Sequence, residues 1–318
     1  MMTPLALIAA CFLDLIFGDP EGFPHPVVLM GRLIAGLEGF ARSITHSSQG
    51  RRLAGIMITL FLVFLCYGLS LLLIHGAAGI HPVMGWGVAV FLAYTTLSAR
   101  SLHQEADRVK RCLEQGRIEE ARRFLSGIVG RETQDLTEQE IIRAAVETVS
   151  ENTSDGVIAP LFYLLIGGPP AAMAYKAVST LDSMLGYKHE HFRDLGWFPA
   201  RFDDFANFIP ARITGLLMVL GSLFLNLSAP GALRIMRRDG RKHDSPNAGI
   251  PEAAAAGALG VQLGGTNVYM GAARPKLHLG DPKRPLHVKC IREAVSLMYA
   301  SSLLMIAFSV FIRFLLSH

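Results

Sequence analysis

Uncharged apolar stretches alternate with polar stretches along this chain. The apolar ones are 53–74, 83–99, 157–175, 213–233 and 294–312, with a weaker sixth at 5–17. A bilayer core of roughly 30 Å needs about 20 helical residues, with a usable range of about 17 to 25, so each of the five is long enough to cross a membrane. The pattern predicts an all-α, polytopic integral membrane protein.

The stretch 157–175 differs from the other apolar stretches because it contains helix breakers. Pro160 and the run Gly167-Gly168-Pro169-Pro170 would interrupt a regular helix. Broken backbone at membrane depth is tolerated only where the protein itself buries it. We therefore expect a partial or re-entrant segment here, and the number of full crossings stays open.

Basic residues beside the first spans predict an orientation. Arg42, Arg51 and Arg52 precede the first strong span, whereas the turn 75–82 has no Lys or Arg. Lys and Arg collect in short cytoplasmic loops, so the N-terminal segment and the chain from Arg100 onward should be cytoplasmic. We expect a multi-pass protein of the inner cell membrane whose active site faces the cytoplasm.

The polar stretch 100–156 predicts a cytosolic helical insertion within a single membrane-embedded domain, 1–318. Apolar residues repeat at helical spacing on both sides of Gly116, which is typical of a helical hairpin. Thr137 and Glu140 have the spacing of a capping box and should open a third helix.

Composition supports the membrane interpretation and excludes several other classes. Hydrophobic residues make up 51% and charged residues 18%, against roughly 25% charged in soluble domains, and the mean hydropathy is +0.37. The four cysteines are scattered without a CxxC pair, so they indicate neither a disulfide framework nor a zinc site. With a net charge of +4 and no nucleic-acid motif, the chain is not expected to bind nucleic acid.

Three acids in the third predicted helix recur every four residues. If the helix continues, Glu147, Glu151 and Asp155 share one face, where their charges repel unless a cation compensates. Mg²⁺ prefers carboxylate oxygens, so these acids, with Asp203 and Asp204, are candidate metal ligands. A solvated acidic face balanced by arginines is the alternative.

A second polar cluster lies between apolar stretches. It comprises Lys176, Asp182, Tyr187, Lys188, Arg193, Asp203, Asp204, Asn207 and Arg212. Ionisable residues near membrane depth usually face a cavity or a partner, and Lys and Arg here can hold a phosphate. A structural network of ion pairs is the alternative. His189 and His191 lack a third ligand at recognisable spacing and are interpreted as surface histidines.

Two further segments are candidates for ligand contact. The first runs from Ser245 through Asn247 to Glu252 and continues with Gly257, Gly260, Gly264, Gly265 and Asn267. Glycines let a backbone approach phosphate oxygens, although a plain Gly-rich turn or a small-residue helix contact would give the same pattern. In the second, His25 lies between two prolines close to Asp19 and Arg32, in either a ligand-facing loop or a rigid turn.

In these polar segments the chain resembles the membrane-bound adenosylcobinamide-phosphate synthases of cobalamin biosynthesis. The resemblance rests on four stretches: DLIFGDPEGFPHPVVLMGRLI, SGIVGRETQDLTEQEIIRAAVETVSENTSDGVIAPLFY, AYKAVSTLDSMLGYKHEHFRDLGWFPARFDDFANFIPARIT and SPNAGIPEAAAAGALGVQLGG. It implies a ligase that joins a propionate carboxyl of adenosylcobyric acid to aminopropanol or its O-phosphate, with ATP as cosubstrate and Mg²⁺. Its implied partners are that corrinoid, the amine, membrane lipid and other enzymes of the pathway, and further copies of the chain are left open.

With this chemistry in view, the candidate residues divide into three sets. The catalytic candidates are His25, Lys176, Asp182, Arg193, Arg212 and Glu252. The substrate- and nucleotide-binding candidates are Asp19, Arg32, Asn152, Tyr187, Ser245, Asn247, Gly264, Gly265 and Asn267. The metal candidates are the five acids named above. His25 or Glu252 would serve as the general base for the amine.

Two other functions fit parts of the pattern. A secondary transporter would use the broken stretch 157–175 around a midplane site, but the two halves of the chain show no convincing repeat. An intramembrane prenyltransferase would need two Asp-rich motifs, and Asp203-Asp204 is the one convincing acid pair.

Overall fold

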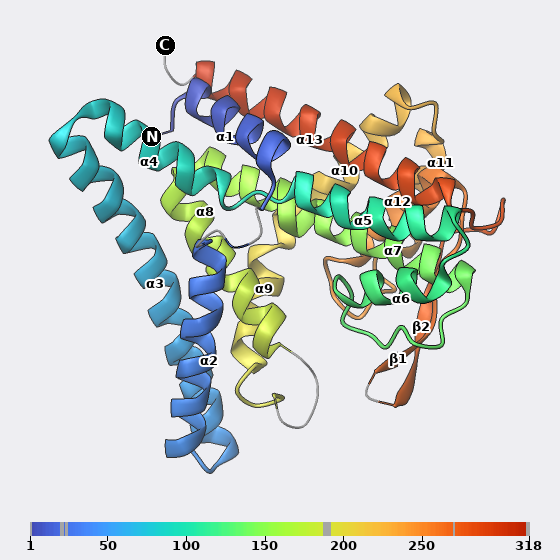
Figure 1. Cartoon of the computed structure of the whole chain (residues 1–318), viewed down its shortest axis with the longest axis horizontal. Helices are drawn as coiled ribbons and strands as arrows, with labels where there is room; N and C mark the ends of the chain where they lie inside the picture. The colour runs from blue at the N-terminus through green and yellow to red at the C-terminus, as the bar shows by residue number, and fades with distance from the viewer. Residues whose placement is uncertain (1, 20–21, 23–24, 187–191, 270, 316–318) are drawn as a thin grey trace. The chain divides into compact units, whose positions relative to one another are not determined.

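The computed structural model describes residues 2–19, 22, 25–186, 192–269 and 271–315. Within them the chain is almost entirely helical (Figure 1). The elements in chain order are α1 (Pro4–Phe17), α2 (Pro26–Ile44), α3 (Ser48–Ile80), α4 (Pro82–Tyr94), α5 (Ala99–Glu114), α6 (Ile118–Ser126), α7 (Glu138–Thr153), the π-helix η1 (Ser154–Ile158), α8 (Ala159–Leu185), α9 (Trp197–Ala206), α10 (Phe208–Phe224), α11 (Ala229–Asp239), α12 (Gly249–Leu259), β1 (Leu263–Tyr269), β2 (Ala272–Leu279) and α13 (Lys289–Leu315).

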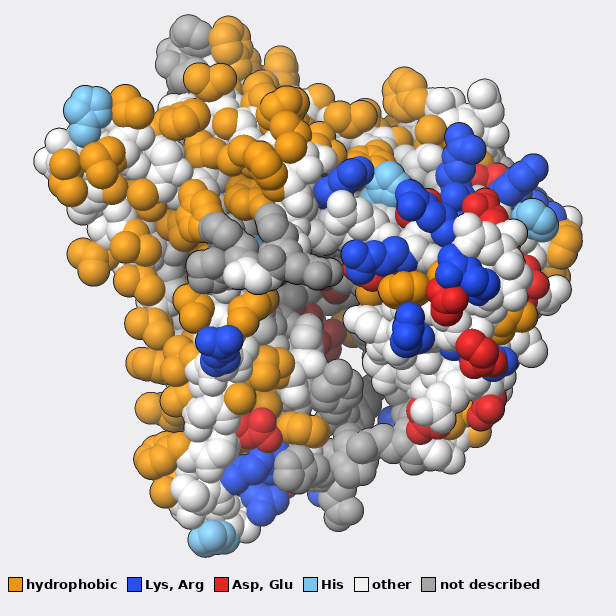
Figure 2. Space-filling model, in the orientation of Figure 1, with side chains coloured by type: hydrophobic (Ala, Val, Ile, Leu, Met, Phe, Trp, Pro, Cys, Tyr) orange, Lys and Arg blue, Asp and Glu red, His pale blue; other side chains and the backbone are white. Residues whose placement is uncertain are grey.

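Several helices have the length and composition of membrane spans, as the apolar stretches predict. Among the described residues there are four such spans: Ser48–Ile80, Pro82–Glu114, Glu138–Leu185 and Lys289–Leu315. The bent pair α9 and α10, which meet at 46°, would make a fifth. Large apolar side chains on α3, such as Phe64 at 70% exposure, point away from the protein core, as expected for contact with lipid. Figure 2 shows these apolar side chains over α3 and α4.

One predicted span, 213–233, has the wrong boundaries. The helix α10 ends at Phe224, and a new helix begins at Ala229. Asn226 adopts a positive φ of 54°, and the Ser228 hydroxyl accepts the Gly231 N–H at 3.1 Å as the N-cap of α11. One continuous apolar stretch can therefore contain the end of one helix and the start of the next, because a local turn and an N-cap separate the two helices.

The break expected in 157–175 is present. Helical hydrogen bonding continues on both sides of Gly168 in α8, but Gly168 itself has φ 68° and ψ −164°, which is not helical. Pro169 and Pro170 follow directly, and a proline disfavours helical backbone at the residue before it. The π-helix η1 precedes α8, so two irregular turns bound its first half.

The chain divides into two compact units. Unit 1 comprises Met1–Ser98, Ala159–Asn207 and Phe308–His318, and unit 2 comprises Ala99–Ile158 and Phe208–Ala307. The predicted helices of 100–156 are thus part of unit 2, together with a distant stretch of sequence. The single domain and the cytosolic placement of that insertion stay predictions.

In unit 1, α3 packs along α8 and α4 (Figure 1). Its core contains Ile34, Leu62, Leu181 and Leu185, all fully buried. In unit 2, α12 packs against α10 and α11 around Met218 and Leu297. A Cβ on Gly257 would collide with the Gly231 backbone, so glycine lets α11 and α12 approach closely. This agrees with the small-residue helix contact considered for this segment.

Unit 2 also carries two features of the polar sequence that matter for its site. The hairpin α5–α6 turns at Gly116 with φ 69°, and Thr137 and Glu140 form the predicted capping box at the start of α7. The segment 263–279 forms an antiparallel β-hairpin, with Leu263 paired to Leu279 and an irregular register at Gly265. The all-α prediction did not include this hairpin.

Candidate active site

Unit 2 buries an unusual number of charged side chains. Glu147 and Glu252 are 4% and 2% exposed, and Glu151 is partly buried. They extend from α7 and α12 toward the loop before α7, the loop before α12 and the β-hairpin. We call the following set the charged interior: Arg131, Arg143, Glu147, Glu151, His243, Glu252, Asn267 and Lys276. Buried charges are costly unless they are paired, so the set is either a structural network or a functional site.

Glu147 is the most completely bonded acid of the charged interior. Its Oε2 accepts from Arg131 Nη2 at 2.5 Å, and its Oε1 accepts from the Gly264 N–H at 2.8 Å. Arg143 Nε lies 3.9 Å from the same Oε1. These contacts tie α7 to β1 and to the loop before α7.

The glycine pair 264–265 makes this arrangement possible. Gly264 and Gly265 have positive φ angles of 84° and 97°, a region that favours glycine. A Cβ on Gly265 would lie against Arg143 Nη1, which donates to the Gly264 carbonyl. The Gly264 N–H holds a carboxylate of the chain itself, and its predicted contact with a nucleotide stays a prediction.

Asn267 links the two arginines. Arg131 Nη1 donates to its Oδ1, and Arg143 Nη2 donates to the same oxygen at 3.3 Å. Asn267 is 1% exposed, and its buried Nδ2 has no hydrogen-bond partner in the described part of the chain. A buried donor without a partner is costly, so this N–H is suited to an acceptor atom of a ligand.

Glu252 lies at the centre of the acid–base part of the charged interior. Its Oε1 is 3.8 Å from His243 Nε2, which is 3.1 Å from Lys276 Nζ. Burial, followed by the charges of Glu147 and Glu151, raises the pKa of Glu252 well above its usual range. A carboxyl with a raised pKa holds a proton more readily than an ordinary glutamate, which makes Glu252 a candidate for proton transfer.

His243 is held in its neutral form. Burial, followed by the charge of Lys276, lowers the pKa of His243 to about 4. Its Nδ1 accepts the Ser245 N–H at 3.0 Å, which fixes the ring at the start of the loop before α12. The loop predicted as a ligand contact is therefore joined to the charged interior through His243.

Three of the predicted residues meet in the loop before α12. Arg212 Nη1 donates to Asn247 Oδ1 at 2.8 Å, and its Nη2 donates to the Pro246 carbonyl at 3.2 Å. The Ser245 hydroxyl accepts the Asn247 N–H at 3.2 Å. Asn152, by contrast, donates to the Thr148 carbonyl at 3.0 Å within its own helix.

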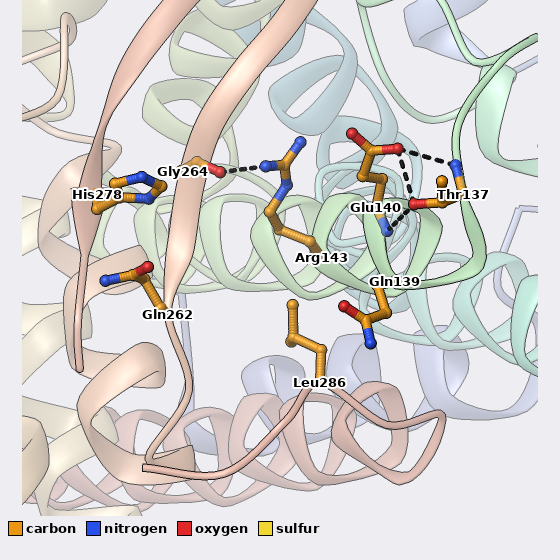
Figure 3. A pocket seen from close by; sticks show the side chains of 8 residues that line it. All are labelled: Thr137, Gln139, Glu140, Arg143, Gln262, Gly264, His278 and Leu286. Carbon is orange, nitrogen blue, oxygen red and sulfur yellow. Dashed lines mark hydrogen bonds between the residues drawn. The ribbon is translucent and has the colours of Figure 1, made fainter. Parts of the chain in front are cut away.

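A cavity of ≈ 370 Å³ adjoins the charged interior (Figure 3). It is lined by Thr137, Gln139, Glu140, Arg143, Gln262, Gly264, His278 and Leu286. Arg143 belongs to both, and Gly264, whose N–H binds Glu147, lines the cavity as well, so the cavity and the charged interior share a wall. Its volume suits a small molecule.

The remaining predicted residues belong to unit 1. His25 Nε2 is 3.3 Å from Asp19 Oδ1, and His25 Nδ1 accepts the Val27 N–H at 3.3 Å as the N-cap of α2. This geometry agrees with the rigid-turn alternative. Arg32 lies in α2, Lys176 and Asp182 lie in α8, and Arg193 lies in the loop before α9. Tyr187, like His189 and His191, lies outside the described residues.

Asp203 takes part in a polar network of unit 1. Its Oδ2 accepts from Asn207 Nδ2 at 3.0 Å, and Asn207 Oδ1 accepts from the Tyr175 hydroxyl at 2.9 Å. Tyr175 stacks on Tyr163 with ring centroids 4.8 Å apart. The five metal candidates are thus divided, with Asp203 and Asp204 in unit 1 and the other three in unit 2.

Comparison with known proteins supplies the family. The model of the family described as "CobD/Cbib protein" matches residues 7–298, which is most of the chain. The chain belongs to the CobD/Cbib protein family. It is 54% identical to the cobalamin biosynthesis protein CobD of Geobacter metallireducens, over 94% of this chain and 93% of that protein.

Two further relatives have the same extent. The chain is 47% identical to the cobalamin biosynthesis protein CobD of Klebsiella pneumoniae, over 98% of each chain. It is 46% identical to the cobalamin biosynthesis protein CbiB of Salmonella arizonae, over 99% of each chain. No solved structure matches the chain. The resemblance inferred from the four polar stretches is therefore confirmed at the level of the family.

The five candidate acids do not form a ready-made metal site in the described part of the chain, and their binding of Mg²⁺ stays a prediction. Among the described residues no group of three or more His, Cys, Asp or Glu side chains is arranged to hold a metal ion. Glu147 is already bonded to Arg131 and Gly264, and the α-helical register on which Asp155 depended ends at Thr153, where η1 begins. Cationic side chains compensate the acids of α7.

Four members of the charged interior were missed by sequence reasoning, and one of them is Arg143, which lies in α7 itself. Arg131 lies in the loop before α7, His243 lies two residues before the predicted Ser245, and Lys276 lies in β2. His243 stands beside a loop that was already a candidate. No sequence pattern marked Lys276 as a site residue, because its position near Glu151 depends on the β-hairpin, which was not predicted.

Proposed function

We propose that this CobD/Cbib protein is the enzyme of cobalamin biosynthesis that forms the amide between adenosylcobyric acid and aminopropanol or its O-phosphate. ATP would be the cosubstrate, supplied as its Mg²⁺ complex. Family membership supports the pathway. The observation that carries the reaction type is Glu252, a buried carboxyl with a raised pKa beside His243 and Lys276.

The proposed reaction needs an activated acyl group. A carboxylate is a poor acyl donor, so it first attacks the γ-phosphorus of ATP to give an acyl phosphate and ADP. The amine then attacks the acyl carbon, the C–N bond forms, and phosphate leaves with the C–O bond electrons. The ammonium form of the amine cannot attack, so one proton must pass to a base of the protein.

Glu252 is suited to accept that proton. A base is most effective when its pKa lies near the working pH, and burial among other carboxylates moves the pKa of Glu252 upward in that direction. The adjoining cavity has room for the small amine rather than for the corrinoid.

The cationic side chains of the charged interior would stabilise the negative charge of the acyl phosphate. Lys276 lies beside His243, and Arg131 and Asn267 line the same cluster. Preorganised donors of this kind stabilise charge that develops on phosphate oxygens in the transition state. Because ATP is cytosolic, the proposal requires the charged interior to open toward the cytoplasm of a protein in the inner membrane.

The test is a product assay with the full-length protein purified in detergent. Given adenosylcobyric acid, aminopropanol phosphate and Mg·ATP, it should yield the amide, ADP and phosphate in equal amounts. Omission of ATP should abolish the amide. Amide formation without ATP consumption, or no amide under these conditions, would contradict the proposal.

Secondary transport is the second candidate, because α8 is broken at Gly168 in the manner of transporter helices. It predicts accumulation of a corrinoid in proteoliposomes without ATP. The ligase predicts no such uptake, so the two functions separate in one pair of assays.

A further inference from the structure

One end of unit 1 gathers arginines and aromatic rings from three segments. Arg42 comes from the last turns of α2, Arg51 and Arg52 come from the first turn of α3, and Phe192 and Trp197 come from the segment at the start of α9. Arg42 lies 5.3 Å from the Phe192 ring centroid, and Arg52 lies 5.8 Å from that of Trp197. We call these five residues the arginine collar. Figure 2 shows basic side chains gathered at this end of α2.

The acids among the described residues leave part of the arginine collar without a hydrogen-bond partner. Glu38 accepts from Arg42 at 2.8 Å, and Asp194 accepts from Arg52 at 3.1 Å. Arg51 has no ion pair within the described residues. Arg42 Nη2 and Arg51 Nε are buried nitrogen atoms without a hydrogen-bond partner in the same part of the chain. Buried N–H groups of this kind are costly until an acceptor reaches them.

The carboxylate of Asp194, beside Arg52, already has other partners. A hydrogen bond from the Ser48 side chain, followed by Arg52, lowers the pKa of Asp194, which therefore stays charged and bonded to α3. Within the described residues no further acceptor reaches these nitrogen atoms, and an acceptor from outside the chain should be an anion because the groups that would bind it are guanidinium groups. Arginine binds phosphate oxygens in a bidentate fashion.

The surroundings of the collar indicate that the anion carries hydrocarbon chains. Leu53 and Met57, which follow Arg52 along α3, are 60% and 62% exposed. With 33 residues, α3 is about 50 Å long, so it extends beyond a hydrocarbon core of roughly 30 Å. Arginine and tryptophan at such a helix end are typical of the boundary between lipid and water.

We propose that the arginine collar is a binding site for the phosphate headgroup of an anionic phospholipid, whose acyl chains lie against the exposed apolar positions of α3. The headgroup oxygens take the N–H groups of Arg42 and Arg51 that the chain leaves unbonded. This site is independent of the amide-forming reaction and would exist whatever unit 2 catalyses.

The test uses the full-length protein stripped of lipid in detergent. Phosphatidylglycerol or phosphatidylcholine with identical acyl chains is titrated, and bound lipid is counted by native mass spectrometry. The wild type should bind phosphatidylglycerol in preference to phosphatidylcholine. The substitution Arg51→Gln should weaken phosphatidylglycerol binding about five-fold, as expected for one basic side chain at an anionic surface. Adding Arg42→Gln should weaken it about five-fold again.

A matched control removes an arginine elsewhere. Arg117 lies in the turn between α5 and α6, and its side chain is 47% exposed and paired with Glu120. The substitution Arg117→Gln should leave lipid binding unchanged. Equal binding of the two lipids, or wild-type affinity in a folded Arg51→Gln protein, would overturn the proposal. Displacement of the lipid by inorganic phosphate alone would show a free-phosphate site and would overturn it equally.

Discussion

The Gly264 residue shows how much of the charged interior depends on one backbone conformation. Its N–H donates to Glu147, its carbonyl accepts from Arg143, and its φ of 84° is accessible mainly to glycine. A side chain at this position would strain the backbone and would also meet the Leu277 carbonyl. One glycine thereby places two charged side chains of α7.

The substitution Gly264→Ala should therefore lower the free energy of unfolding by roughly 3 kcal/mol, from backbone strain plus the collision. Gly116 is the matched control, because its φ of 69° is similar and nothing lies near its Cβ. Gly116→Ala should cost about 1 kcal/mol. Thermal unfolding in detergent compares the two, and equal losses would show that the collision is unimportant.

His243 gives a prediction about pH. Burial and Lys276 lower its pKa to about 4 in the folded chain, against 6.5 for an ordinary histidine. The unfolded chain therefore takes up this proton at a higher pH, and the folded state loses up to about 3 kcal/mol as pH falls from 6.5 to 4. His243→Gln cannot titrate, so its stability should fall less over this range than that of the wild type.

The control for this pH effect is His46→Gln, at an exposed position. It should follow the wild-type curve. The measurement is the melting temperature of each protein between pH 6.5 and pH 4. If the curves of His243→Gln and the wild type were parallel, His243 would not be a buried, neutral histidine.

At the scale of elements, helices were predictable where their signals were local. The capping box at Thr137, the turn at Gly116 and the break at Gly168 are each encoded within a few residues, and each is present. The β-hairpin was not predictable, because β1 contains two glycines of positive φ and β2 is mostly exposed, so neither strand shows the alternation that marks a strand. The break between α10 and α11 was missed because it depends on a local turn at Asn226 and on the N-cap of α11 at Ser228.

The close approach of α11 and α12 can be tested at this scale. Gly257→Ala should destabilise the protein by about 2 kcal/mol, because the new methyl group would collide with the Gly231 backbone. Gly87, in α4, has nothing near its Cβ. Gly87→Ala should leave stability unchanged or raise it slightly, since alanine favours helix. Thermal unfolding that ranks the two in the opposite order would refute the packing argument.

At the scale of the whole molecule, the apolar stretches were sufficient to predict a polytopic helical protein, and four polar stretches were sufficient to suggest the family. The partners of the site residues were not predictable in the same way. Repulsion among the acids of α7 indicated a need for positive charge, but the spacing of Glu147 and Glu151 could not show that Arg131 and Lys276 lie beside them. Those cations come from segments whose approach only the tertiary fold decides.

The candidate residues are divided between the two units. The charged interior is assembled within unit 2, whereas His25, Lys176, Asp182 and Arg193 belong to unit 1. The acid–base role that the sequence left open between His25 and Glu252 is better supported at Glu252, since His25 caps α2 and pairs with Asp19.

The decisive measurement is the rate of amide formation from adenosylcobyric acid, aminopropanol phosphate and Mg·ATP by wild type and Glu252→Gln, with Glu138→Gln as an exposed control on α7. The melting temperature of each variant verifies that it is folded. We predict a loss of about 100-fold or more for Glu252→Gln and a wild-type rate for Glu138→Gln. A folded Glu252→Gln protein that forms the amide at the wild-type rate would contradict the role proposed for this carboxyl.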